Sequence, residues 1–148
     1  MMSQRNVDHV RRLFETFHSG VPDARAFVAE FWDPDCCLYP LRILPDAGPR
    51  HGLDDITSYY TSLMEIWDSY VLVPRTVEAV GDDRVLVRVA VRARGRDSHL
   101  ALEADLCCCI WLRNGRIMRW EDHRTEAGAL NALGVNEQPI EPGAERNA

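Results

Sequence analysis

The hydrophobic positions of this chain change their period near residue 70. Before that point apolar residues recur every three or four positions, a spacing typical of helices with one buried face. After it they alternate with polar residues, a spacing typical of strands with one buried face. The pattern predicts an α+β domain in which a block of helices precedes an antiparallel sheet and packs on one of its faces.

Two helices are predicted before residue 36. The first carries apolar residues from Val10 to Phe17 and ends near Gly20. The second begins after Asp23, which is a candidate N-cap, and ends at Asp33-Pro34-Asp35, because the residue before a proline avoids helical geometry. A strand over residues 36–41 and a loop over residues 42–52 are predicted to follow.

A third helix begins after the loop. Asp54 and Asp55 lie near its positive end, where carboxylates are stabilising. Its buried stripe is predicted to contain Leu53, Ile56, Tyr60, Leu63, Met64 and Trp67.

The second half of the chain predicts four strands. Pro74 places the first, residues 70–80, at a sheet edge or a bulge, since proline cannot donate to the ladder. The second follows a turn at residues 81–83 and alternates valines with other residues over 85–92. Asn114-Gly115, the strongest short-range hairpin signal, joins the third strand (100–112) to a fourth that ends at His123. A short helix then closes at Gly134, so we expect one domain over 1–135 and a loose tail over 136–148.

The turn near Gly95 fixes a register for the second and third strands. If Arg94 faces His99, Arg88 lies opposite Asp105 and the valines share one face with Leu106 and Cys108. The opposite face then carries a mixed patch that suits a two-fold interface: Arg88, Arg92, Glu103, Asp105 and Trp111.

Composition excludes several function classes. With 148 residues, 46% of them hydrophobic, the chain can form one proper core. The net charge of -6 disfavours nucleic acid and anionic membranes as partners. No apolar run is long enough for a membrane helix and the N-terminus is too polar for a signal peptide, so we expect a cytoplasmic protein. All 17 basic residues are arginine, which removes lysine-based chemistry.

The five cysteines occur as Cys36-Cys37 and Cys107-Cys108-Cys109. Neither block has the spacing of a zinc or thioredoxin motif, and neighbouring strand residues point to opposite faces. We therefore expect reduced core thiols, without disulfide, bound metal or other cofactor.

Several segments together resemble the SnoaL-like branch of the nuclear transport factor 2-like superfamily. They are Phe31-Trp32-Asp33-Pro34-Asp35, His51-Gly52, residues 85–91, Arg113-Asn114-Gly115-Arg116-Ile117, Trp120-Glu121-Asp122-His123 and residues 129–134. The resemblance implies a cone-shaped, curved antiparallel or mixed sheet packed against three N-terminal helices, with a short C-terminal helix. It also implies a deep apolar pocket and a homodimer formed through the outer sheet face.

Two activities of the superfamily are disfavoured by the residues present. The positions of the ketosteroid isomerase tyrosine, base aspartate and protonated aspartate hold Leu13, Pro40 and Cys108. Of the five polar residues used by limonene-epoxide hydrolases, only the final-strand aspartate is matched, at Asp122. The other four positions hold Leu38, Pro40, Val89 and Val91.

SnoaL-type polyketide cyclases give the closest functional match. Their final-strand aspartate corresponds to Asp122, while the position of their neighbouring histidine holds Cys108. Asp122 faces inward if Met118 and Trp120 do. Burial would then raise its pKa and suit it to general acid or base work. The alternatives are that Asp122 caps the following helix or pairs with an arginine such as Arg124 or Arg119.

The sequence therefore predicts a SnoaL-like enzyme in which Asp122 moves a proton during isomerisation, cyclisation or dehydration of a small hydrophobic metabolite, such as a polyketide or terpenoid intermediate. Around it we expect a pocket lined by Trp120, Cys108, Tyr60, Leu38, Val89, Leu106 and His51, with Cys108 as a packing residue rather than a nucleophile. The alternative is a non-catalytic dimeric module that binds a hydrophobic ligand or stabilises a partner.

Overall fold

The computed structural model describes residues 2–17, 23–41 and 48–135. The predicted tail over 136–148 and the predicted helix end near Gly20 lie outside these residues. In chain order the elements are α1 (Met2–Thr16), α2 (Ala24–Phe31), β1 (Trp32–Tyr39), β2 (Arg50–His51), α3 (Gly52–Ile66), β3 (Trp67–Val80), β4 (Arg84–Gly95), β5 (Ala101–Arg113), β6 (Arg116–His123) and α4 (Glu126–Ala132).

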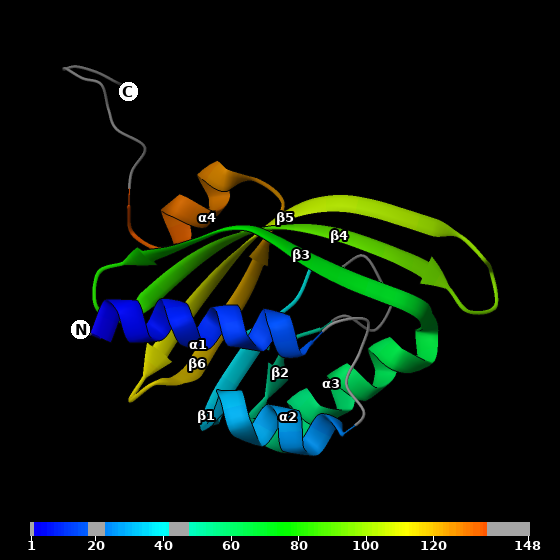
Figure 1. The fold of residues 1–148 in the computed structure, drawn as a ribbon, viewed down its shortest axis with the longest axis horizontal. Coiled ribbons are helices and arrows are strands. Elements are labelled where there is room, and N and C mark those ends of the chain that lie inside the picture. Colours follow the sequence, from blue (N-terminus) through cyan, green and yellow to red (C-terminus); the bar gives the residue numbers. More distant parts are fainter. Residues whose placement is uncertain (1, 18–22, 42–47, 136–148) are drawn as a thin grey trace.

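The described strands form one mixed sheet in the order β2-β1-β6-β5-β4-β3. Every neighbouring pair is antiparallel except β1 and β6, which are parallel. The sheet is open and curved, and α1, α2 and α3 cover its concave side (Figure 1). This architecture confirms the predicted α+β fold.

The short helix α4 lies on the opposite side of the sheet from the other helices (Figure 1), where it packs on β5 and β6. The sheet consequently separates two apolar clusters. The larger one, under α1–α3, contains Val87, Val89, Cys108, Ile110 and Trp120. The smaller one, under α4, contains Leu86, Cys107, Cys109, Ala129 and Leu133. Strand alternation therefore places Cys108 on the inner face and its two neighbours on the outer face.

Several local sequence signals are found in the structures that they predict. The Asp23 carboxylate accepts a hydrogen bond from the Ala26 N–H at 3.0 Å and caps α2. Asn114 and Gly115 both have positive φ, 52° and 77°, as the two central residues of a type I′ turn require. Pro74 lies on the edge strand β3, beside a register shift.

The strand predicted over 36–41 begins earlier, because α2 passes directly into β1 at Trp32. The Asp33-Pro34-Asp35 segment therefore belongs to the strand. Arg113, at the end of β5, holds both carboxylates, with nitrogen–oxygen distances of 3.0 Å to Asp33 and to Asp35. The predicted loop over 42–52 also contains a short strand, β2.

The predicted register of β4 and β5 is wrong by two residues. Arg94 pairs with Ala101, and Arg88 lies opposite Cys107 rather than Asp105. The reason is a longer turn, closed by a hydrogen bond from the Gly95 N–H to the Leu100 carbonyl at 2.8 Å. Because side chains alternate with period two, an offset of two leaves every residue on its predicted face.

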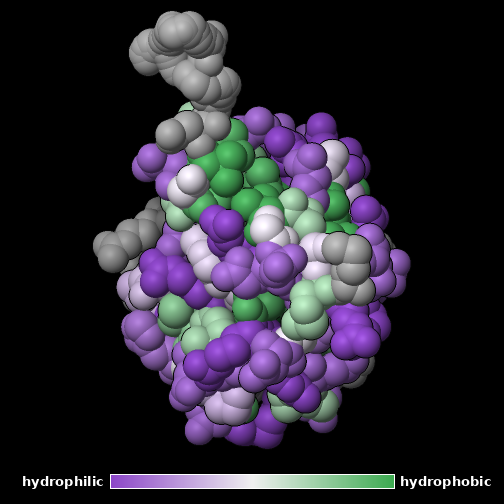
Figure 2. All heavy atoms as spheres, turned by 90° about the vertical axis from the view of Figure 1, so that its left-hand side faces the viewer, coloured by the Kyte–Doolittle hydropathy of each residue, from purple (hydrophilic) through white to green (hydrophobic). Residues whose placement is uncertain are grey.

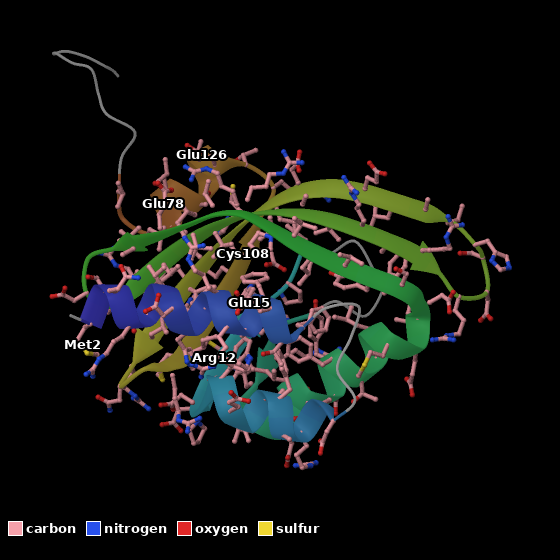
Figure 3. All side chains as sticks on the ribbon, viewed as in Figure 1. Met2, Arg12, Glu15, Glu78, Cys108 and Glu126 are labelled. Carbon is pink, nitrogen blue, oxygen red and sulfur yellow. The ribbon has the colours of Figure 1, made fainter. Side chains whose placement is uncertain are left out.

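Arg88 makes its ion pairs with Glu78 of β3 and Glu126 of α4, and it also donates to the Thr76 hydroxyl at 3.0 Å. Figure 3 shows Glu78 and Glu126 on the α4 side of the sheet. This network ties α4 to the outer face.

The surface seen from the left-hand side of Figure 1 is mostly polar, with apolar side chains gathered toward the top of the view (Figure 2).

The strand β6 contains a bulge that the sequence did not reveal. Leu112 pairs with Ile117, but Trp111 pairs with Arg119, so Met118 is an extra residue between them. Ile117 fills the core in place of Met118, which corrects the premise that Met118 faces inward. Beyond the bulge, Trp120 and Asp122 still face the inner side.

Candidate functional site

A cavity of about 40 Å³ lies between the inner face of the sheet and the helices α1 and α3. Its lining comprises Leu13 and Phe14 from α1, Phe17 directly after that helix, Tyr59, Tyr60 and Leu63 from α3, and Leu38, Tyr70, Leu72, Val89, Leu106, Cys108, Trp120 and Asp122 from the strands. Among these described residues Asp122 is the only one with a charge. The site is therefore a mostly apolar cavity with several aromatic rings and one carboxylate.

Asp122 is held by donors on three segments. Its Oδ1 accepts hydrogen bonds from Trp120 Nε1 at 2.8 Å and from Cys108 Sγ at 3.2 Å. Cys108 reaches it because the two residues are paired across β5 and β6. The Leu41 backbone N–H is a further donor to this carboxylate. In Figure 3, Cys108 lies near the middle of the sheet, on the side covered by α1.

The two alternative roles for Asp122 are filled by other residues. The Thr125 hydroxyl caps α4 by accepting from the Gly128 N–H at 3.0 Å. Arg119 pairs with Glu121 on the outer face, with a hydrogen bond of 2.6 Å. Asp122 is thus neither a helix cap nor the partner of Arg119.

Burial is the dominant influence on the Asp122 carboxyl and raises its pKa above the ordinary value. The hydrogen bonds from Trp120, Cys108 and Leu41 act in the opposite direction, as does His123, but the net direction is upward. A carboxylate whose pKa is raised is a stronger base than an ordinary aspartate, which favours a role in accepting and returning a proton.

Three tyrosines face this carboxylate. Burial raises the pKa of Tyr59, Tyr60 and Tyr70, and the charge of Asp122 raises each further. All three hydroxyls therefore remain protonated at neutral pH and can donate hydrogen bonds inside the cavity. Tyr60 was predicted to line the pocket, whereas Tyr59 and Tyr70 supply polar groups that the sequence interpretation lacked.

Tyr59 and Tyr70 were missed as site residues for different reasons. Tyr59 precedes Tyr60 on α3, and adjacent helical residues do not share one stripe. Tyr70 lies near the start of the edge strand β3. It pairs with Ala93, two positions from the Leu72–Val91 pair, and therefore lies on the inner face. The alternation of Tyr70 with Leu72 is the signal that could have found it.

The Cys108 thiol is buried, with 3% of its surface exposed. Burial and the neighbouring Asp122 charge raise its pKa well above the ordinary value. It is consequently a thiol at neutral pH, which suits a hydrogen-bond donor and not a nucleophile.

The structure brings together all of the predicted pocket residues except one. Trp120, Cys108, Tyr60, Leu38, Val89, Leu106 and Asp122 line the cavity. His51 does not: its side chain is exposed, and its ring lies 6.2 Å from the ring of Tyr39. His51 lies in the short strand β2 and pairs with Cys37 of β1. This pairing turns the His51 side chain away from the cavity.

The described residues contain neither a candidate metal site nor a candidate membrane-spanning helix. No group of three or more histidine, cysteine, aspartate or glutamate residues in this part of the chain could hold a metal ion. None of the helices in the described ranges is long and apolar enough to cross a lipid bilayer.

The SnoaL-like domain family matches residues 10–120 of the chain. The comparison with curated proteins found no match. Similar solved structures include Bal32a from a soil-derived mobile gene cassette, at 19% identity and a TM-score of 0.74 over 89% of this chain and 98% of that one. A candidate SnoaL-like polyketide cyclase from Jannaschia sp. CCS1 has 16% identity and a TM-score of 0.71 over 93% and 96%. A protein with a ketosteroid isomerase-like fold from Catenulispora acidiphila, solved in complex with trimethylamine, has 10% identity and a TM-score of 0.65 over 83% and 92%.

Proposed function

The chain belongs to the SnoaL-like domain family, and from that premise we propose that it is a cofactor-free acid–base enzyme acting on a small hydrophobic molecule. Asp122 is the proton shuttle in this proposal. The reaction class is isomerisation, cyclisation or dehydration, and the family and the cyclase-like neighbour from Jannaschia support a role of this type. A cytoplasmic location belongs to the same proposal.

One observation carries the proposal: a half-buried carboxylate is held by oriented donors at the wall of an apolar cavity. Trp120 and Cys108 both bind Oδ1, which restricts the rotation of the carboxylate. Orientation of this kind is what a proton-transfer group requires, because the donor and acceptor atoms must meet within hydrogen-bond distance.

Proton abstraction also suits the charge of the cavity. When Asp122 accepts a proton from a carbon acid, the negative charge moves from the carboxylate to the substrate and the total charge of the cavity does not change. The hydroxyls of Tyr59, Tyr60 and Tyr70 can donate to the new anion in a site with little water. Asp122 then returns the proton at another atom, which completes an isomerisation or begins a dehydration.

The size of the cavity limits the part of a substrate that reacts. About 40 Å³ accommodates only a few water molecules, whereas pockets for drug-sized ligands measure about 300–1,000 Å³. A larger metabolite would insert a compact reacting portion beside Asp122, and the remainder would require side chains at the mouth to move.

A non-catalytic dimeric binding module is the second candidate. It is favoured by the apolar residues that stand where the superfamily's isomerases carry catalytic ones. Leu13, for example, occupies the position of their tyrosine and is an apolar lining residue here. The dimer would use the outer sheet face, where a groove of about 240 Å³ is lined by both signs of charge, including Arg75, Arg92, Glu103 and Asp105.

Deuterium exchange separates the two candidates without knowledge of the substrate. Small ketones such as acetone, cyclobutanone and cyclohexanone exchange their α-protons in D2O, and ¹H NMR follows the rate. We expect the protein to accelerate exchange of at least one of them, and Asp122→Asn to lower that acceleration by about 10²–10⁴-fold.

Glu121→Gln is the matched control, because Glu121 neighbours Asp122 on β6 but pairs with Arg119 on the outer face. Its exchange rate should equal that of the unmodified protein. Acceleration that survives in Asp122→Asn, or none for any ketone, would favour the binding module.

A further inference from the structure

The aromatic rings of the cavity point to a narrower ligand class than a hydrophobic molecule. We infer that the cavity binds a compact organic cation, a methylated ammonium group, with its charge between the Asp122 carboxylate and the surrounding rings. This inference concerns the ligand of the same cavity and therefore rests on the proposed function. The inference goes beyond that function, because acid–base chemistry on a carbon acid does not require a positive charge on the ligand.

Six aromatic rings line the cavity, in two groups of rings that contact one another. They belong to Phe14, Phe17, Tyr59, Tyr60, Tyr70 and Trp120. Their centroids lie close to one another: 5.6 Å for Phe17 and Tyr60, 6.2 Å for Phe17 and Tyr70, and 5.7 Å for Phe14 and Trp120. The face of an aromatic ring carries negative charge density and attracts a cation within about 6 Å. Rings on several sides of one small space are the arrangement that recognises alkylated ammonium groups.

The charge of the lining favours the same ligand. Trp120 Nε1 and the Leu41 N–H can only donate, so both stabilise the ionised form of Asp122. No arginine or histidine is among the described lining residues, and His123 bonds Glu121 at 2.9 Å on the outer face. A cation in the cavity would therefore compensate a desolvated carboxylate, whereas an anion would be repelled by it.

The volume agrees with a small head group. A cavity of about 40 Å³ holds a few water molecules and matches a quaternary ammonium better than a fused ring system. A methylated ammonium also has a low cost of dehydration relative to a primary ammonium, because its methyl groups cover the charge.

Isothermal titration calorimetry with a matched pair of probes tests the inference. Tetramethylammonium and tert-butanol are compact, have equal numbers of heavy atoms and differ in charge. At constant ionic strength, set with sodium chloride, we expect tetramethylammonium to bind at least about tenfold more tightly. In Asp122→Asn the tetramethylammonium affinity should fall at least about tenfold while that of tert-butanol is unchanged.

Ring substitutions give an independent readout. Tyr70→Phe keeps the ring and should keep the tetramethylammonium affinity within about twofold, whereas Tyr70→Leu should lower it about three- to tenfold. Circular dichroism establishes that each variant is folded, and Glu121→Gln controls for loss of a carboxylate elsewhere on β6.

Equal binding of the two probes, no binding of tetramethylammonium, or an affinity that Asp122→Asn leaves unchanged would each overturn the inference. The ketone exchange assay reads the proposed function separately. Exchange that depends on Asp122 without preference for the cation would refute the ligand class alone.

Discussion

Asp122 makes the folded protein less stable at neutral pH, because burial raises the pKa of its carboxyl above the unfolded value of 3.8. The folded form therefore binds the Asp122 proton more tightly than the unfolded form does. As the pH falls through the folded pKa, protonation of Asp122 increases the free energy of unfolding. This increase is complete below the unfolded pKa. Asp122→Asn should therefore raise the free energy of unfolding at pH 7 by about 1.4 kcal/mol per unit of upward shift.

Urea denaturation at pH 7 and pH 4 checks this prediction. The advantage of Asp122→Asn over the unmodified protein should shrink at the lower pH, because a larger fraction of the buried Asp122 carboxyl is then protonated. A variant that is less stable at pH 7, or equally advantaged at both pH values, would show that Asp122 does not bear a raised pKa.

Single residues were predictable where strand alternation decided their position. Cys108, Trp120 and Asp122 lie on the inner face, as the resemblance implied. His51 was not predictable, because its orientation depends on its pairing with Cys37 in β2. The hydrogen-bond donors to Asp122 come from two strands and the Leu41 backbone. The hydrophobic pattern of the sequence cannot show that these segments meet.

At the scale of elements, signals with a local cause were reliable and signals that depend on pairing were not. Asp23 and Asn114-Gly115 act through their own backbone geometry, and both formed the predicted structure. The β4–β5 register depended on the length of the turn after Gly95, and the bulge at Met118 depended on how β6 pairs with β5. Neither leaves a mark in the hydrophobic pattern.

The β5–β6 turn can be tested with one methyl group. Gly115 has a φ of 77°, and a Cβ added there would meet nothing within 4 Å. The cost of Gly115→Ala is therefore purely that of left-handed backbone geometry, and we expect a loss of about 1–2 kcal/mol in the free energy of unfolding.

Gly48→Ala is the matched control. A Cβ at Gly48 also meets nothing within 4 Å, and its backbone does not have a positive φ. Thermal or urea denaturation should show little or no loss of stability for Gly48→Ala. Equal losses in both variants would contradict the assignment of the cost to the turn.

At the scale of the whole molecule, α4 changes the predicted dimer interface. The helix covers Cys107 and Cys109 on the outer face, and Arg88 is engaged by Glu78 and Glu126. The part of the predicted patch left for a partner is centred on Arg92, Glu103 and Asp105. The homodimer remains a prediction.

Sedimentation at micromolar concentration should give twice the mass of the chain. In a two-fold interface an arginine of one subunit can meet an acid of the other, so Arg92→Glu should favour the monomer and the double variant Arg92→Glu with Glu103→Arg should restore the dimer. A monomer at all concentrations for the unmodified protein would refute the interface.

The central claim is that Asp122 is a desolvated proton-transfer group and not a structural carboxylate. Its most direct test is the ¹³C NMR titration of the Asp122 carboxyl carbon, assigned by its absence in Asp122→Asn. We expect a titration midpoint above 3.8, the ordinary value for an aspartate. A midpoint at or below that value would contradict the account, because the donors Trp120, Cys108 and Leu41 would then outweigh burial and leave Asp122 a held, non-titrating anion at neutral pH.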